Sequence, residues 1–159
     1  MIGYPASTKQ LQFRVYGMPR PAGSKRGFHI KKAGKTIVVD TNKHSKTWKG
    51  DVKDAALSVA PDTLLSGPLI LEVVFVMPRP KAHYRTGRYA SELKPSAPEH
   101  HINTPDVTKL MRGTEDALKG IIWVDDSLIY KQIGEKVYGE RPGAIITVIW
   151  QEPVDGSPC

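Results

Sequence analysis

The sequence contains a single cysteine, Cys159, and no long apolar run. One cysteine cannot form a disulfide within the chain, and a reducing compartment suits such a protein. No segment approaches the roughly 20 apolar residues that a membrane-spanning helix needs. The opening residues MIGYPASTKQ also lack the apolar core of a signal peptide. We therefore expect a soluble cytoplasmic protein that does not engage a membrane.

Acidic residues are the other scarce class, since 16 Asp and Glu stand against 23 Lys and Arg, a formal net charge of +7. Basic surfaces bind polyanions because neutralised phosphates release their counterions. The charge therefore favours a nucleic-acid partner, although an ordinary solvated basic surface would have the same composition. Many of the basic residues are concentrated in two stretches, which contain Arg20, Lys25, Arg26, Lys31, Lys32, Lys35, Lys43, Lys46, Lys49 and Lys53 in the first third, and Arg79, Lys81, Arg85 and Arg88 further along.

The length of 159 residues and a hydrophobic content of 40% suit one domain with a real core. Residues 69–77 are nearly all apolar, many of them β-branched, which is typical of a central strand covered on both faces. The predicted order is strand 11–16, hairpin 28–32 with 35–40, helix 46–60, strand 69–77, helix 105–119, a strand from 125, and strand 144–151. This order predicts an α+β fold in which two main helices cover one mixed β-sheet.

The predicted domain covers residues 1–159, with a basic loop insertion at about 79–103 and a flexible tail at about 152–159. The insertion mixes proline, basic, aromatic and histidine residues without a helical or strand period. Loops of this length inside compact domains are usually functional or disordered. We expect Arg85 and Arg88 to hold phosphates there while Tyr84 and Tyr89 stack on unpaired bases, with a flexible linker as the alternative.

The predicted helix 105–119 has clear end signals, because Thr104 can cap it, Pro105 suits its first position and Gly120 suits its end. Its apolar residues form one stripe, which should pack on the core while the remaining faces meet solvent or a ligand. The stripe comprises Val107, Leu110, Met111, Thr114, Ala117, Leu118 and Ile121, and the residues off it are Asp106, Lys109, Arg112, Gly113, Glu115 and Asp116.

Carboxylates at the start of this helix and just beyond its end predict a metal site. Asp125 and Asp126 open the next predicted strand. Mg²⁺ and Mn²⁺ prefer oxygen ligands and are often held by one or two carboxylates together with water and phosphate. We choose Asp106 and Asp126 as the principal ligands, with Asp125 beside them as a further ligand or a cap of the turn. Asp116 lies about 15 Å along the helix from Asp106, too far to share one ion with it.

Three motifs between residues 105 and 139 resemble the RusA family of Holliday junction resolvases, endodeoxyribonucleases frequent in phages and prophages. They are P-D-x-x-x-L, D-A-L-x-G and D-D-S-x-I, the last followed by a strand ending in Val-Tyr-Gly. The resemblance implies a RusA-like fold and a homodimer with two active sites. It also implies Mg²⁺ as cofactor, with Mn²⁺ as a substitute, and paired symmetric nicks in four-way DNA junctions. Such an enzyme would act in DNA recombination and repair in the cytoplasm of a bacterial host.

Carried over by position, the family's first and last catalytic aspartates fall on Asp106 and Asp126. The usual pattern P-D-x-D-N-L-x-K has Thr108 here in place of its second aspartate, and Lys109 and Arg112 in place of its asparagine and lysine. The resemblance implies catalytic roles for Thr108, which can hold a water, and for Arg112, which can neutralise a phosphate. The missing carboxylate leaves Glu115, Asp116 and His101 as alternative replacements. Phosphate contacts are expected from Lys25, Arg26 and Lys109 besides Arg85 and Arg88.

Two other functions stay open from the sequence. The threonine at position 108 is compatible with a catalytically weak or silent protein that only binds branched DNA. A nuclease of flaps and replication forks would carry the same residues. Metal-dependent cleavage separates the first alternative from a resolvase, and competition between substrates separates the second.

Overall fold

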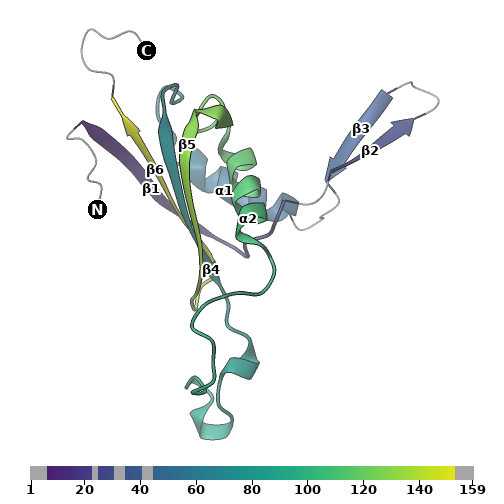
Figure 1. Ribbon diagram of the computed structural model, residues 1–159, viewed down its shortest axis with the longest axis vertical. Helices are drawn as coiled ribbons and strands as arrows, with labels where there is room; N and C mark the ends of the chain where they lie inside the picture. Colours follow the sequence, from purple (N-terminus) through teal and green to yellow (C-terminus); the bar gives the residue numbers. More distant parts are fainter. Residues whose placement is uncertain (1–6, 23–24, 31–34, 41–44, 153–159) are drawn as a thin grey trace.

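The computed structural model describes residues 7–22, 25–30, 35–40 and 45–152, and between residues 25 and 46 it describes the backbone alone. Its main sheet has four strands in the order β1-β6-β4-β5 (Figure 1). They are β1 (Thr8–Tyr16), β4 (Leu69–Met77), β5 (Ile129–Tyr138) and β6 (Gly143–Gln151). β6 pairs antiparallel with both β1 and β4, whereas β4 and β5 are parallel. This mixed sheet and its two helices confirm the predicted single α+β domain.

Strand β4 is one of the two inner strands of the sheet, as its apolar sequence predicts, but helices cover one of its faces rather than both (Figure 1). Leu69, Leu71 and Phe75 are fully buried on the face that meets the helices, and Ile70 is 3% exposed on the other face. β5, in contrast, is an edge strand in which most residues are exposed. A strand paired on both sides and covered on its helical face has little room for polar residues.

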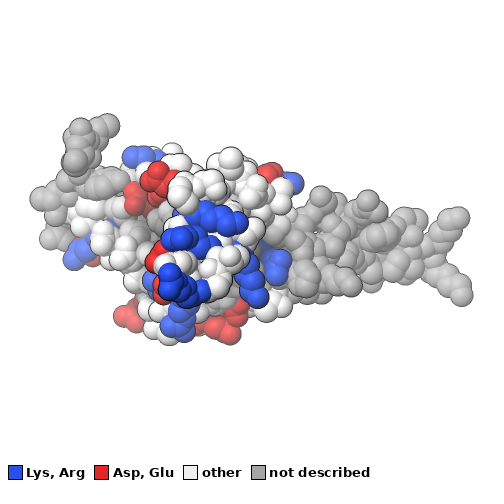
Figure 2. All heavy atoms as spheres, turned by 90° about the horizontal axis from the view of Figure 1, so that it is seen from below, with Lys and Arg blue, Asp and Glu red and all other residues white. Residues whose placement is uncertain are grey.

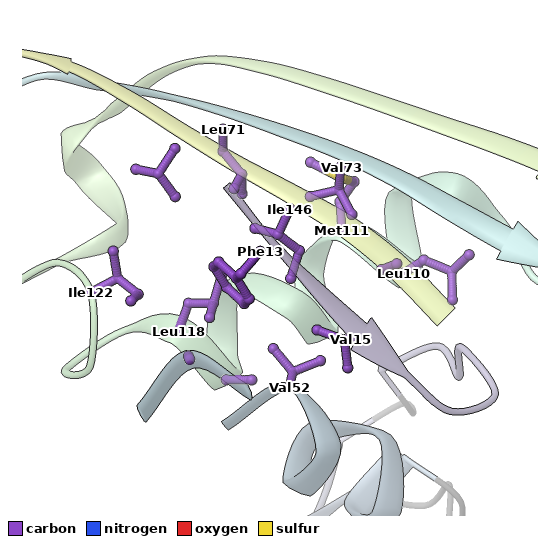
Figure 3. Packing of buried hydrophobic residues seen from close by; sticks show 14 of the residues in the cluster. Phe13, Val15, Val52, Leu71, Val73, Leu110, Met111, Leu118, Ile122 and Ile146 are labelled. Atoms are coloured by element: carbon purple, nitrogen blue, oxygen red, sulfur yellow. The ribbon is translucent and has the colours of Figure 1, made fainter. Parts of the chain in front are cut away.

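Two helices, α1 (Ser45–Leu57) and α2 (Val107–Leu118), cover one face of the sheet (Figure 1). Side chains from both helices and three strands meet between the layers in Figure 3, among them Val52 of α1, Leu118 of α2 and Phe13 of β1. The predicted stripe of α2 is confirmed, because its buried residues include Leu110, Met111, Thr114, Ala117 and Leu118.

Gly113 was predicted to lie off the packed face, and this is wrong. The chain after β1 crosses α2 at this point, and the backbone N–H of Ala22 donates to the Lys109 carbonyl at 3.1 Å. A Cβ atom at Gly113 would lie 3.4 Å from the same nitrogen. The glycine is therefore buried because a loop, which has no periodicity to predict it, packs against a second side of the helix.

The predicted ends of α2 also need correction. The helix spans Val107–Leu118 and its N-cap is Asp106, not Thr104. The Asp106 carbonyl accepts the first helical hydrogen bond, from Leu110 N at 3.1 Å, while its own backbone is extended. α1 ends at Leu57 rather than Ala60, because Ser58 turns its hydroxyl back onto the Asp54 and Ala55 carbonyls.

Asp125 and Asp126 do not open a strand, contrary to the prediction. A single 3₁₀ turn, η3 (Asp126–Leu128), comes first, and β5 begins at Ile129. The Asp125 carboxylate accepts a hydrogen bond from Ser127 N at 3.0 Å, which stabilises this turn. Of the two roles expected of Asp125, the cap of the turn is confirmed.

A separate two-stranded hairpin joins β2 (Lys25–Ile30) and β3 (Lys35–Asp40) in antiparallel register, so the predicted hairpin is confirmed with its first strand at 25–30 rather than 28–32. Residues 31–34 between these strands and the predicted tail at 153–159 lie outside the described residues. In the described part of the chain, neither helix is long and apolar enough to cross a membrane.

The insertion at residues 79–103, here called the arm, projects beyond the end of the sheet (Figure 1). It is internally hydrogen-bonded. It contains two single-turn helices, η1 (Lys81–His83) and η2 (Gly87–Tyr89), and an antiparallel bridge between Tyr84 and Leu93. Backbone hydrogen bonds from Arg85 to Glu92, 2.8 Å, and from Lys94 to His83, 2.9 Å, flank that bridge. No residue of the arm is buried, so polar contacts must hold its shape.

Candidate active site

A groove of about 350 Å³ lies between α2 and β5. Positions 108, 112 and 115 share one face of α2 because they are spaced by four and three residues. From β5, Gln132 and Gly134 face the same space, and a Cβ atom at Gly134 would lie 2.9 Å from Val107. The groove is lined by Val107, Thr108, Met111, Arg112, Glu115, Gln132 and Gly134. Two predicted catalytic residues, Thr108 and Arg112, are thus placed together.

Asp126 is held by a buried indole. Its Oδ1 accepts a hydrogen bond of 2.8 Å from Nε1 of Trp123, whose side chain is fully buried. The rigid core therefore determines how this carboxylate is oriented, while the carboxylate itself stays partly accessible.

Glu115 is the carboxylate of the groove. Its burial raises the pKa to about 7, with further contributions from the negative charges of Asp126 and Asp116, against the opposing charge of Arg112. The negative charge of Asp126 therefore acts on Glu115 from outside the described lining of the groove. Two carboxylates held near one another favour a cation between or beside them.

Asp106 lies at the other end of α2. Its carboxylate is exposed, pairs with Lys109 Nζ at 3.6 Å and makes no side-chain cap hydrogen bond. Nine positions separate it from Glu115, which corresponds to about 14 Å along a helix. It stands outside the described lining of the groove and next to Thr108, which belongs to that lining. The structure thus brings Thr108, Arg112 and Glu115 together and leaves Asp106 at the helix N-terminus.

Asp125 has local partners. Hydrogen bonds from Lys119, 2.8 Å, and from Ser127 hold the pKa of Asp125 well below its usual range, and the same contact raises the pKa of Lys119. As a metal ligand, Asp125 would compete with these contacts, and this role stays a prediction.

The three alternatives for the missing carboxylate are in different surroundings. Asp116 points to α1, where Lys49 Nζ lies 3.6 Å from its carboxylate. His101 lies at the base of the arm with its ring 5.2 Å from that of Tyr138, and burial together with the Lys136 charge lowers its pKa. Of the three, Glu115 alone lines the groove.

The carboxylates near the groove could hold a cation that prefers oxygen ligands, such as Mg²⁺, with few protein ligands. Within the described ranges, no three His, Cys, Asp or Glu side chains are arranged to hold a metal ion. Mg²⁺ needs no such cage, because one or two carboxylates with water and substrate phosphate suffice. Glu115 and Asp126 fit that requirement, and the nearby Arg112 would accompany a phosphate.

The predicted DNA-binding residues are spread over the molecule. Lys109 is exposed beside Asp106, and Arg85 and Arg88 belong to the arm. Lys25 and Arg26 begin β2, and their side chains lie outside the described part of the structure. The hydrogen bond from Ala22 to Lys109 nevertheless brings the segment leading to β2 alongside α2.

Lys136 is a contributor that sequence reasoning missed. Its Nζ donates to the carbonyls of Asn103, 2.7 Å, and Pro105, 2.9 Å, and so fastens the segment that leads into Asp106. Its position in the sequence could have indicated this role. Lys136 follows Gly134 by two residues in β5, and alternate residues of a strand share a face, so it lies on the face that meets α2.

Comparison with known proteins places the chain in a family. The family model described as Endodeoxyribonuclease RusA matches residues 16–149, which include α2, η3 and β5. The chain is also 32% identical over 136 residues to the uncharacterized protein YqaN of Bacillus subtilis (strain 168). That alignment covers 83% of this chain and 90% of the relative. The chain therefore belongs to the RusA family of endodeoxyribonucleases.

Proposed function

We propose that this protein is a divalent-metal-dependent endodeoxyribonuclease that resolves four-way DNA junctions by paired, symmetric nicks. Family membership supports the endonuclease reaction and the junction as its substrate. The observation that carries the proposal is the groove in which Thr108, Arg112 and Glu115 meet, with the negative charge of Asp126 acting on Glu115. Negative groups for a cation thus lie beside a positive group for a phosphate.

Three residues of the groove lining, together with Asp126, have a role in the proposed hydrolysis. Asp126, oriented by Trp123, and Glu115 would hold Mg²⁺ or Mn²⁺. The ion, when bound, would lower the pKa of a water and polarise the scissile phosphate. Arg112 would offset the charge that develops on the phosphate, and the Thr108 hydroxyl would orient the attacking water. No covalent intermediate is needed.

Asp106 keeps its proposed catalytic role at the N-terminal end of α2, outside the described lining of the groove. It precedes Thr108 by two residues, and its carboxylate must exchange Lys109 for the substrate or for a cation other than the one beside Glu115, which lies about 14 Å along the helix. Because that ion pair is exposed, its loss costs about 1 kcal/mol or less. Lys109, once free, would be available to a neighbouring phosphate.

A homodimer is part of the proposal. A four-way junction has approximate twofold symmetry, and two identical subunits related by a twofold axis would place one active site on each of two opposing strands. Support for this assembly comes from the family resemblance. A nuclease of forks or flaps would not need the paired geometry.

The proposal is tested by incubating the protein with a synthetic four-way junction, a fork and a linear duplex of matched sequence, with Mg²⁺, with Mn²⁺ and without metal. Metal-dependent, symmetrically placed nicks in the junction are the expected result. Preferential cutting of the fork would favour the flap and fork nuclease. Binding without cleavage in either metal would instead favour a silent junction-binding protein, as Thr108 in place of a carboxylate allows.

Lys136 is expected to be a positioning residue for Asp106. The substitution Lys136→Met removes both hydrogen bonds that fasten residues 103–105, and displacements near 1 Å can reduce a rate roughly a hundred-fold. We expect kcat for junction cleavage to fall roughly ten- to a hundred-fold while junction affinity without metal changes little. Single-turnover cleavage and binding titrations measure the two effects.

The matched control is Lys131→Met, which removes an exposed lysine from the same strand. It should leave kcat unchanged, and amide hydrogen exchange at residues 104–107 should accelerate only in Lys136→Met. Equal kcat for Lys136→Met and the parent would contradict the positioning role.

A further inference from the structure

We propose that the arm binds DNA backbone phosphates outside the cleavage site through Lys81, Arg88 and Lys94, and that Arg85 serves to hold the arm in shape. The inference rests on the proposed function for the identity of the polyanion. It adds a second, sequence-independent contact to the substrate.

The base of the arm packs against one aromatic residue of the sheet, Tyr138 at the end of β5. The Arg79 guanidinium lies 4.3 Å from the centre of the Tyr138 ring, and the rings of His83 and His101 meet that ring edge-on at 5.4 and 5.2 Å. Arg79 also donates to the Pro98 carbonyl at 2.6 Å. Residues from the entry and the exit of the arm thus converge on one side chain, which holds its base closed.

Within the arm, a second aromatic residue organises the charges. The guanidinium groups of Arg85 and Arg88 lie 4.2 and 4.8 Å from the centre of the Tyr89 ring. Arg85 also forms an ion pair of 2.7 Å with Glu92, across the bridge that closes the loop. Arg85 is therefore engaged by both Tyr89 and Glu92. Within the described part of the chain, Arg88 contacts the Tyr89 ring and forms no ion pair.

The arm carries more positive charge than it neutralises. Five Lys and Arg residues face two acids, Glu92 and Glu99, and the exposed cations Lys81, Arg88 and Lys94 have no ion pair within the described part of the chain. Seen from the end where the arm projects, blue Lys and Arg side chains gather over the middle of the molecule (Figure 2). Exposed Lys and Arg side chains without acidic partners can bind the phosphates of a DNA backbone.

The contacts favour the DNA backbone over stacked bases. Two guanidinium groups already lie over Tyr89, and Tyr84 is half-buried in the bridge to Leu93. A base would have to displace these contacts before it could stack. The expectation that both tyrosines stack on unpaired bases is therefore replaced by phosphate binding.

The arm has a defined position relative to the groove. Its last residue, Asn103, is held by Lys136, and Asp106 follows three residues later. Because Tyr138 and Lys136 both belong to β5, the same strand secures the arm and lines the groove. The arm would therefore contact a duplex segment of the substrate at a set distance from the cleaved bond.

The test is the salt dependence of binding for a fluorescent four-way junction and a linear duplex, measured without divalent cation. For the double variant Lys81→Ala with Arg88→Ala, the slope of log K against log salt should become shallower by about 0.9 for each lost contact. Affinity for both DNAs should fall on the order of ten-fold at 0.1 M salt.

The control Lys131→Ala removes an equal exposed charge outside the arm and should leave the slope unchanged. Arg85→Ala should open the arm, seen as faster trypsin cleavage between residues 81 and 94. If the parent protein cleaves junctions but the double variant has the parental salt slope, the arm proposal is overturned and the proposed function stands. A shallower slope in a protein that cleaves no DNA would uphold the arm and refute the proposed function.

Discussion

Asn in place of Asp126 is expected to reduce junction cleavage by about a thousand-fold or more while junction binding persists. The variant keeps the shape of the side chain, and its amide oxygen can still accept the hydrogen bond from Trp123 Nε1. It removes the negative charge that would hold the cation beside Glu115. Single-turnover cleavage in Mg²⁺, with binding measured separately in its absence, distinguishes lost chemistry from lost affinity.

The neighbouring Asp125→Asn is the matched control. Because Lys119 and Ser127 engage the Asp125 carboxylate, we expect cleavage to stay within about three-fold of the parent, and a larger loss would instead support the predicted metal-ligand role of Asp125. A readout independent of activity is the melting temperature, which Mg²⁺ should raise in the parent and in Asp125→Asn but not in Asp126→Asn. Parental cleavage by Asp126→Asn would exclude the proposed role.

Glu115→Gln is expected to reduce cleavage by about a hundred-fold or more and, at alkaline pH, to stabilise the fold. Burial and the charge of Asp126 raise the pKa of Glu115 to about 7, so the folded protein favours the neutral carboxyl. As pH rises from the ordinary carboxyl range through 7, ionisation of Glu115 destabilises the fold. Glutamine cannot ionise, and the variant should therefore melt at a higher temperature than the parent at pH 8, with no difference near pH 4.

Asp116→Asn separates this effect from a general loss of acidic charge. Asp116 is adjacent in sequence but pairs with Lys49 of α1 at 3.6 Å, away from the groove. Cleavage should be nearly unchanged in this variant, and the melting temperature at pH 8 should not rise to that of Glu115→Gln. If both variants cleave at the parental rate, Glu115 does not replace the carboxylate that Thr108 lacks.

A gain in stability together with a loss of activity would identify Glu115 as a group retained for function. A half-buried carboxylate close to another carboxylate costs stability in the absence of a cation. If Glu115 and Asp126 hold a cation together, their function explains why this destabilising arrangement is retained.

Periodicity in the sequence was sufficient for the elements that pack on one face. The stripe of α2 and the apolar run of β4 were predicted because a buried surface repeats every 3.6 or every two residues, whatever the partner is. The family motifs located Asp106, Thr108, Arg112 and Asp126 along the chain, since the motifs are local in sequence. Both kinds of signal depend on neighbours within a few residues.

Contacts between distant residues were beyond that kind of signal. Gly113 is buried by residues 20–22, and Lys136 reaches Asn103 and Pro105, more than 30 residues away. Likewise, the arm has no period because hydrogen bonds and Arg–Tyr contacts, rather than a repeated apolar face, hold it together.

Local patterns were thus enough to establish the fold class, the packed faces and the chemical kinds of residue near the site. The choice of Glu115 over Asp116 and His101 required the packing of α2 between α1 and β5, which turns adjacent carboxylates toward different partners. The physical reason is that each side chain's position on its own helix or strand is encoded locally. The residue that a side chain meets across a groove depends on how separate helices and strands pack together. This packing is determined by the whole hydrophobic core.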